Sequence, residues 1–256
     1  MRGASTAFRV SSLSERGFKV KNLMAVFVAC LSLGGGAALA QTPPETPMDH
    51  NHMGHSDHMS PDGAFHRRFD DAEKWAKEFD NPERDAWQKP EEVVEALGLT
   101  PAMSVADIGE GTGYFAARIA KRVGQGRVFA ADIEPDMVRY LGERAGREHL
   151  ENIVPVQTSA DAANLPEPVD LILVVDTYHH IGNRTQYFAK LLASLRPGGR
   201  LVIIDFKADS PNGPPPQHRI PPEKVAEELG AAGYALSETR PILPRQYFLV
   251  FQKRGL

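Results

Sequence analysis

From residue 103 onward, the chain alternates short apolar runs with segments whose apolar residues recur every three or four positions. The apolar runs predict strands, and the wider spacing predicts helices with one buried face. The first predicted strand starts at residue 103, and the others cover 127–133, 153–157, 169–175, 201–206, 234–239 and 247–252. The predicted helices cover 114–123, 184–195 and 222–232, and another starts at Pro135. Because strand and helix alternate before a closing hairpin, the pattern predicts an α/β fold on a mostly parallel sheet.

The segment before this alternation predicts two more helices. Aromatic residues recur at helical spacing over residues 65–79, which predicts one helix there. Pro90 favours the start of a second helix, over residues 91–97. We therefore expect one domain over residues 64–256, with a helical cover at 64–99 and the sheet core at 100–256.

The first forty residues have the parts of a secretory signal peptide. Basic residues precede an apolar run at 23–33, and Ala-Leu-Ala at 38–40 has the small-residue pattern of a cleavage site. The apolar run is too short to span a bilayer securely. An uncleaved anchor and a lipid-modified Cys30 are the alternatives. We expect a periplasmic or secreted protein without membrane attachment after signal cleavage.

Residues 41–63 are rich in Pro, His, Met and Asp and lack apolar periodicity, which predicts a disordered linker. Imidazoles and thioethers suit copper, and imidazoles also suit nickel. The candidate metal ligands are His50, His52, His55 and His58. The alternative is a solvated linker without a metal.

Charge and cysteine content narrow the possible functions. The net charge is −4, and the first forty residues contain five basic groups and one acid, so the remainder carries −8. Such an acidic chain argues against a nucleic acid or an anionic membrane as substrate. The single cysteine is Cys30, so the chain after residue 40 has no disulfide, thiolate zinc site or cysteine nucleophile.

The first predicted strand of the sheet runs into a glycine-rich turn, Asp-Ile-Gly-Glu-Gly-Thr-Gly at residues 107–113. Alternate glycines let the backbone turn sharply and approach a ligand. The third glycine comes one residue too early for the dinucleotide fingerprint, and the phosphate-loop pattern is absent. The turn resembles motif I of the class I S-adenosylmethionine-dependent methyltransferases, and the resemblance extends over residues 74–253. It implies a Rossmann-like, seven-stranded sheet with helices on both faces and an antiparallel C-terminal strand.

The same resemblance implies how S-adenosylmethionine is held. An acid about twenty residues after the glycines can accept from both ribose hydroxyls, which assigns Asp132 to the sugar. Ile133 matches the residue on which the family packs adenine, and Asp161 matches the acid that binds its amino group. Trp87 is a candidate for the cover over the cofactor, with ordinary core packing as the alternative. The predicted cofactor contacts are Trp87, Gln88, Asp107, Gly109, Glu110, Gly111, Gly113, Asp132, Ile133, Asp161, Ala162 and Asp176.

Residues near the ends of later strands are candidates for the methyl acceptor's side. Methyl transfer needs a base only when the acceptor carries a proton, and imidazole has a suitable pKa. The candidate bases are His179, His180 and His218, and the candidate acceptor-pocket residues are Tyr178 and Arg219. For the adjacent histidines, the alternative is a structural bond to the backbone.

Two acids, Asp176 and Asp205, end adjacent predicted strands, as the magnesium ligands do in catechol-type methyltransferases. Those enzymes have Asn after the second acid, where this chain has Phe206, so the sequence favours no catalytic metal. We therefore predict an S-adenosylmethionine-dependent methyltransferase acting on a small-molecule O, N or C nucleophile. The alternative is an exported, non-catalytic protein of the same fold that binds a nucleoside or a metal, since S-adenosylmethionine is made in the cytosol.

Overall fold

The computed structural model describes residues 58–59 and 64–255. The predicted signal peptide and residues 41–57 and 60–63 of the predicted linker lie outside the described residues. At the start of the described chain, β1 (His58–Met59) pairs antiparallel with β2 (Phe65–His66). No helix in these described segments is long and apolar enough to cross a bilayer.

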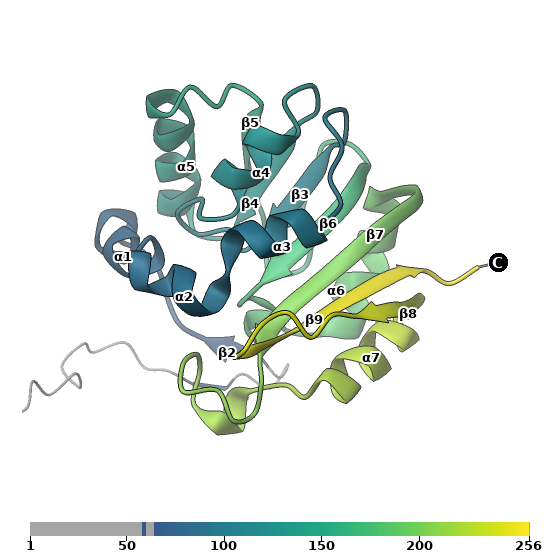
Figure 1. Cartoon of the computed structure of the whole chain (residues 1–256). Helices are drawn as coiled ribbons and strands as arrows, with labels where there is room; N and C mark the ends of the chain where they lie inside the picture. The colour runs from purple at the N-terminus through teal and green to yellow at the C-terminus, as the bar shows by residue number, and fades with distance from the viewer. Residues whose placement is uncertain (1–57, 60–63, 256) are drawn as a thin grey trace, which may run out of the picture. The chain divides into compact units, whose positions relative to one another are not determined.

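A seven-stranded sheet forms the centre of the domain (Figure 1). The order across the sheet is β5-β4-β3-β6-β7-β9-β8, and β9 runs antiparallel to both β7 and β8. The strands are β3 (Val105–Ile108), β4 (Val128–Asp132), β5 (Ile153–Gln157), β6 (Val169–Val175), β7 (Leu195–Phe206), β8 (Tyr234–Thr239) and β9 (Gln246–Lys253). The predicted fold, including its antiparallel C-terminal strand, is confirmed.

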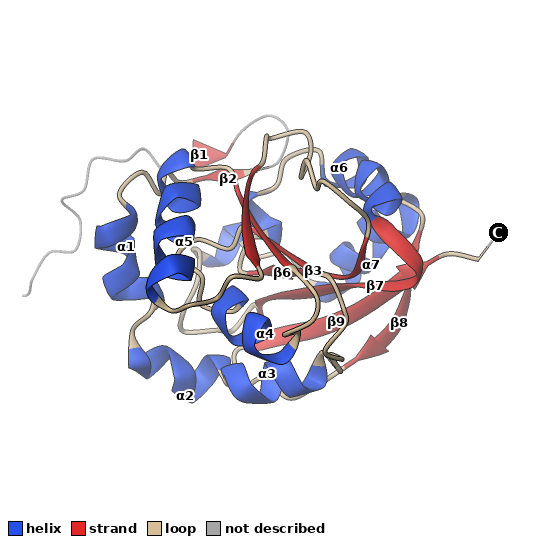
Figure 2. Ribbon diagram, turned by 90° about the horizontal axis from the view of Figure 1, so that it is seen from above, coloured by secondary structure: helices blue, strands red, loops and turns tan. Residues whose placement is uncertain are grey.

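Helices cover both faces of this sheet (Figure 2). One face packs against α3 (Pro90–Ala96), α4 (Ala116–Arg122) and α5 (Pro135–Arg147), and the other packs against α6 (Arg184–Leu191) and α7 (Pro222–Ala231). Side chains of β6 contribute to both of these apolar layers, so the strand consists almost entirely of apolar residues. This burial fixes the strand ends, where the candidate site residues lie.

The helix predicted over residues 65–79 is shorter than expected. Helix α1 spans Ala72–Phe79, and the Asp71 side chain caps it by accepting a hydrogen bond from the Lys74 N–H. Phe65 instead belongs to β2 and pairs with Met59. The aromatic spacing before Ala72 therefore reflects packing over the site rather than helix formation. Helix α1 is followed by a 3-10 turn (Pro82–Arg84) and α2 (Asp85–Gln88).

The boundary between α6 and β7 also differs from the prediction. Helix α6 ends at Leu191, a 3-10 turn follows at Leu192–Ser194, and β7 already begins at Leu195. The predicted Pro-Gly-Gly turn is present as an irregularity within the strand pairing, because Val169 pairs with Leu195 while Leu171 pairs with Arg200. The long loop after β7 contains a short 3-10 turn at Pro216–His218.

Candidate active site

A cavity of about 570 Å³ lies at the carboxyl ends of β3, β4, β6 and β7. Ligands bind at this edge in open α/β sheets because the loops that follow the parallel strands meet there. Its wall is formed by the glycine turn, the ends of β4 and β6, the α1–α2 cover and the loop after β7. The sequence-predicted residues that line it are Trp87, Asp107, Gly109, Glu110, Gly111, Asp132, Ile133, Asp161, Asp176, His179 and His180.

The glycine turn adopts backbone conformations that other residues rarely reach. Gly109 has φ +70°, and a Cβ added there would lie 2.2 Å from the Thr177 side chain. Thr177 Oγ1 also donates a hydrogen bond to the Gly109 carbonyl, at 3.1 Å. The turn is therefore held tightly against the end of β6, and this close approach requires glycine at position 109.

Asp132 ends β4 and is 7 % exposed. Its Oδ2 accepts from the Gly111 N–H at 2.8 Å and its Oδ1 from the Glu134 N–H at 2.9 Å. Burial raises the pKa of this carboxyl, although these hydrogen bonds oppose the increase. Each carboxylate oxygen can accept a further bond, so the geometry fits a pair of ribose hydroxyls. Next to it, Ile133 is 51 % exposed and offers an apolar surface to the cavity.

Asp107 and Glu110 form a buried acid pair under the glycine turn. The Oδ2 atom of Asp107 has no hydrogen-bond partner among the described residues. Burial raises the pKa of Asp107 well above its ordinary value, and the neighbouring Glu110 raises it further. Glu110 Oε1 also accepts from the Ala116 N–H at the start of α4, at 3.0 Å. An unpaired carboxylate oxygen on the cavity wall fits a cationic group such as the ammonium of S-adenosylmethionine.

The cover over the cavity depends on Arg84, which the sequence analysis missed. Its Nη2 lies 3.3 Å from Asp176 Oδ2, and its guanidinium stacks over the Tyr114 ring at 4.1 Å. Gln88 is fully buried and accepts from Arg84 Nε at 3.1 Å, so it supports Arg84 rather than lining the cavity. Trp87 does line the cavity.

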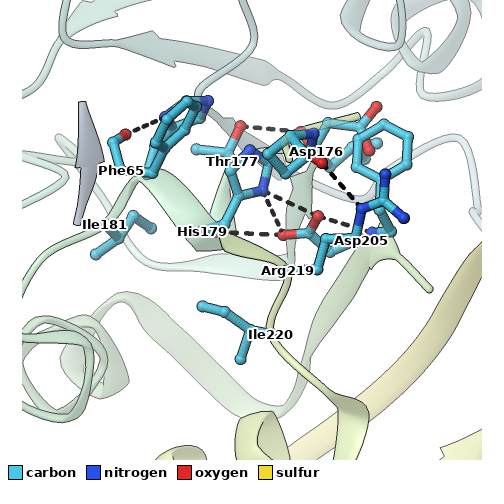
Figure 3. Close-up of polar contacts among 12 residues, drawn as sticks. Phe65, Asp176, Thr177, His179, Ile181, Asp205, Arg219 and Ile220 are labelled. Carbon is cyan, nitrogen blue, oxygen red and sulfur yellow. Dashed lines mark hydrogen bonds and ion pairs between the residues drawn. The ribbon is translucent and has the colours of Figure 1, made fainter. Parts of the chain in front are cut away.

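The acceptor side of the cavity contains a buried imidazole–carboxylate pair (Figure 3). His179 Nδ1 lies 3.0 and 2.9 Å from the two carboxylate oxygens of Asp205. Asp205 also accepts from the Phe206 N–H at 2.7 Å and from the His179 N–H at 3.3 Å. Burial disfavours a charged His179, but the adjacent Asp205 carboxylate outweighs burial and the pKa of His179 is raised. Because His179 Nδ1 contacts Asp205, Nε2 is the ring nitrogen available to a methyl acceptor.

Asp176 lies between this pair and the cover. It has φ +54°, a strained conformation for a residue with a side chain. Gln246 Nε2 donates to its Oδ1, and Arg84 contacts its Oδ2. Burial raises the pKa of Asp176 to about 7; Arg84 opposes this increase and Asp205 adds to it. Asp176 therefore connects the cover to the acceptor side.

The second histidine differs from the first in chemistry. His180 Nδ1 lies 2.5 Å from the Phe65 carbonyl oxygen and donates to it, which is the structural alternative considered from the sequence. Burial lowers the pKa of His180 to about 3, and the neighbouring His179 lowers it further. His180 therefore stays neutral and anchors the β2 segment over the cavity. His218 stacks on the Phe65 ring at 4.5 Å but does not line the cavity.

Other predicted site residues have packing roles. Tyr178 is fully buried and its hydroxyl donates to Glu228 at 2.7 Å, so it belongs to the core rather than to an acceptor pocket. The Arg219 guanidinium donates to loop carbonyls, including that of Ala208 at 2.7 Å, and so holds the loop after β7 together. Gly113 and Ala162 do not line the cavity either.

The predicted metal ligands cannot be placed. His50, His52 and His55 lie outside the described residues, and so does the side chain of His58. Within the part of the chain that the structure describes, no cluster of three or more His, Cys, Asp or Glu side chains is arranged to hold a metal ion.

Comparison with known proteins bears on this geometry. A family model described as a methyltransferase domain matches residues 105–199. The ubiquinone/menaquinone biosynthesis C-methyltransferase UbiE of Shewanella pealeana is 32% identical over 135 residues, which cover 50% of this chain and 49% of that protein. The erythromycin 3''-O-methyltransferase of Saccharopolyspora erythraea is 27% identical over 177 residues, covering 59% and 56%. The chain thus spans about half the length of these curated relatives.

A solved structure, a SAM-dependent methyltransferase from Aquifex aeolicus, superposes with a TM-score of 0.65 and 28% sequence identity. The superposition covers 71% of this chain and 97% of that one. The glycine turn, the acid that ends β4 and these similarities together support a class I, S-adenosylmethionine-dependent methyltransferase domain. The Rossmann-like fold predicted from the sequence is that of this class.

Proposed function

We propose that this protein transfers a methyl group from S-adenosylmethionine to a small-molecule nucleophile, with His179 as the proton acceptor. The observation that carries the proposal is the division of a single cavity into two chemically different sides. Gly109, Asp107 and Asp132 lie on one side, and the His179–Asp205 pair lies on the other. One side fits a nucleoside with an amino-acid end, and the other fits a group that must lose a proton.

The residues of the first side have separate roles in binding. Asp132 accepts from the ribose hydroxyls, Ile133 packs against adenine, and Asp107 pairs with the ammonium group. When bound, S-adenosylmethionine supplies an electrophilic methyl group whose leaving group is a neutral thioether. Chemistry of this kind needs positioning and exclusion of water but no covalent enzyme intermediate.

The residues of the second side prepare the acceptor. Asp205 fixes the ring of His179 and directs Nε2 toward the acceptor. A carboxylate orients the catalytic imidazole in the same way in serine hydrolases. The names of the relatives include both a C-methyltransferase and an O-methyltransferase. These names therefore do not identify the substrate atom that this chain would methylate, and that atom depends on the residues of the acceptor side.

Calorimetric titration of the purified protein with S-adenosylmethionine and S-adenosylhomocysteine tests the proposal. Asp132→Ala should weaken binding tenfold or more, because charge-assisted hydrogen bonds contribute about 1.5–3 kcal/mol each. Asp132 also accepts a hydrogen bond from the Gly111 N–H, so Asp132→Ala would disturb the glycine turn as well as the ribose contact. The 2′-deoxy analogue of S-adenosylhomocysteine separates the two effects, because it removes one ribose hydroxyl and leaves the protein unchanged. The wild type should bind this analogue more weakly than the parent compound, and Asp132→Ala should not distinguish them.

The exposed Asp209 provides a matched control, since Asp209→Ala should leave both affinities unchanged. Absence of any affinity for S-adenosylmethionine in the wild type would contradict the enzyme proposal. That result would favour the non-catalytic, nucleoside- or metal-binding alternative.

We also propose that the protein is exported and cleaved after Ala40, and that the His/Met-rich segment binds Cu or Ni reversibly. The signal-like sequence at 1–40 and the four clustered histidines motivate these proposals. Mass spectrometry of the secreted or periplasmic chain should find Gln41 at its N-terminus, and a full-length cytosolic chain would contradict export. A variant lacking residues 48–59 should lose Cu binding, and in the absence of metal its melting temperature should be unchanged.

A further inference from the structure

Resting on the proposed function, we propose that the methyl acceptor is a neutral, planar hydroxyarene, with its hydroxyl on His179 and its ring between Phe65 and Phe206. Three features of the acceptor side carry this inference: an aromatic wall, the carboxylates beside the base, and the chemistry of the base. Each restricts the acceptor in a different way.

The aromatic wall is continuous across three segments distant in sequence. The Phe65 ring lies 6.3 Å from the His179 ring, and the Phe206 ring lies 6.4 Å from it, so both phenylalanines are neighbours of the proposed base. Trp87 extends the wall, with its ring 5.9 Å from Phe206. All four residues line the cavity. Aromatic surfaces in this arrangement favour a flat ring by stacking or edge contact.

The loop after β7 packs closely on one ring of this wall. Gly213 has φ +92°, and a Cβ added there would lie 2.4 Å from the Phe206 ring. Pro214 and Pro215 continue the loop along the cavity wall. The loop backbone therefore lies directly against the Phe206 ring and holds this ring in the cavity wall.

The charges argue for a neutral acceptor. Three cations line the cavity, and the least exposed of them, Arg84, is paired with a carboxylate. Arg84 pairs with Asp176, Arg68 lies 4.0 Å from Glu134 on the nucleoside side, and Arg67 stacks over Trp75 at 4.8 Å. His180 is neutral. Arg67 and Arg68 are exposed, and these contacts of theirs are not with His179. A carboxylate or phosphate held beside His179 would therefore lose hydration next to the Asp205 and Asp176 carboxylates, and the paired cation, Arg84, is already engaged.

The base selects the type of hydroxyl. A phenolic hydroxyl has a pKa of about 10, as in tyrosine, whereas an aliphatic alcohol is far less acidic. An imidazole whose pKa is raised by Asp205 takes a proton from the former more readily than from the latter. In the step, the acceptor's O–H proton goes to His179 Nε2 and its oxygen forms the new bond to the methyl carbon. The C–S bond electrons stay with sulfur, which leaves as a neutral thioether, and the product is an aryl methyl ether.

The test uses 2-naphthol as the probe. Binding of 2-naphthol to the full protein is measured by quenching of tryptophan fluorescence, because Trp87 lines the cavity. Turnover with S-adenosylmethionine is followed by mass detection of 2-methoxynaphthalene. Cyclohexanol replaces the aromatic hydroxyl with an aliphatic one, aniline replaces the oxygen with nitrogen, and 6-hydroxy-2-naphthoate adds a negative charge to the same ring system.

We expect methyl ether formation from 2-naphthol, none from cyclohexanol, and a kcat/KM at least tenfold lower for the naphthoate. Phe65→Leu should raise the KM for 2-naphthol about five- to tenfold and leave the Kd for S-adenosylhomocysteine within twofold. His179→Gln should lower kcat while 2-naphthol still binds. Methylation of aniline alone, methylation of a ring carbon, or preference for the naphthoate would overturn the inference.

The two proposals fail separately. A protein that binds S-adenosylhomocysteine but neither binds nor methylates 2-naphthol refutes the hydroxyarene inference and leaves the methyltransferase proposal standing. A protein that binds 2-naphthol but has no affinity for either adenosyl compound refutes the proposed function and retains the hydroxyarene as a ligand class.

Discussion

Replacement of Asp176 by asparagine tests the electrostatics of the site most directly. Asp176 is half-buried after the end of β6, between Arg84 and the His179–Asp205 pair, and has φ +54°. Asparagine tolerates this left-handed conformation and keeps an oxygen for the Gln246 hydrogen bond. The substitution therefore removes the ionisable group and changes the shape of the side chain very little.

The magnitude follows from the pKa of Asp176, which burial raises from 3.8 to about 7. The folded protein thus holds a proton more tightly than the unfolded chain does. The corresponding stability is fully present below the unfolded pKa and is lost as the pH rises through 7. Ionisation of Asp176 should cost the wild type about 4 kcal/mol of unfolding free energy between pH 4 and pH 8.

The assay is urea unfolding of wild type and Asp176→Asn at pH 4 and at pH 8. The substitution changes the polar contacts of residue 176 at both pH values, so only the change in the stability difference with pH reports on ionisation. Relative to the wild type, Asp176→Asn should gain about 4 kcal/mol between pH 4 and pH 8. Asp209→Asn, at an exposed loop position, should show no such change. A stability difference that is the same at both pH values would refute the reasoning.

The remaining predictions address single side chains. Gly109→Ala should lower affinity for S-adenosylhomocysteine at least tenfold by calorimetry, because its Cβ would lie 2.2 Å from Thr177 at a positive φ. Tyr178→Phe should cost about 1–3 kcal/mol of stability in urea unfolding, since Glu228 loses a buried partner. The KM for the acceptor should not change. A raised KM would instead support the predicted role of Tyr178 in the acceptor pocket. Asp205→Asn should lower kcat at least tenfold. It should also move the pH at which kcat rises, as His179 loses its proton, to a lower value, because His179 loses the charge that raises its pKa. His180→Asn should leave that midpoint in place, since burial already keeps His180 neutral.

Most of the sheet could be predicted from local pattern alone. Strands β5, β6 and β8 begin and end at the predicted residues because each is a short run bounded by turn residues. The prediction was wrong at residues 65–71, where helical spacing of aromatic residues reflects contacts with His180 and His218, far away in the sequence. It was also wrong at Leu195, because the Pro-Gly-Gly sequence that usually ends a strand is accommodated inside β7.

The candidate site was predictable where residues follow a motif and not where they depend on three-dimensional partners. The glycine turn and Asp132 lie at positions set by the order of strand, turn and strand. The contact between His179 and Asp205 joins residues 26 positions apart, and only the adjacency of β6 and β7 reveals it. Asp205 was recognised as the end of a strand but was considered only as a metal ligand. Arg84 carries no signal in the sequence, because an arginine in a short helical segment is ordinarily a solvated surface residue.

The close contact between Gly213 and Phe206 also affects how the acceptor range of this protein can change. Any side chain at position 213 would displace the loop from the Phe206 ring, because the added Cβ would lie 2.4 Å from it. Gly213→Ala or Gly213→Ser would therefore remodel the acceptor side of the cavity, whose wall includes Gly213 itself. The chemistry of His179 and the nucleoside side would stay intact. Under the proposed function, a single codon change would thus alter the acceptor range without touching the residues assigned to methyl transfer, which makes position 213 a natural starting point for divergence or directed evolution.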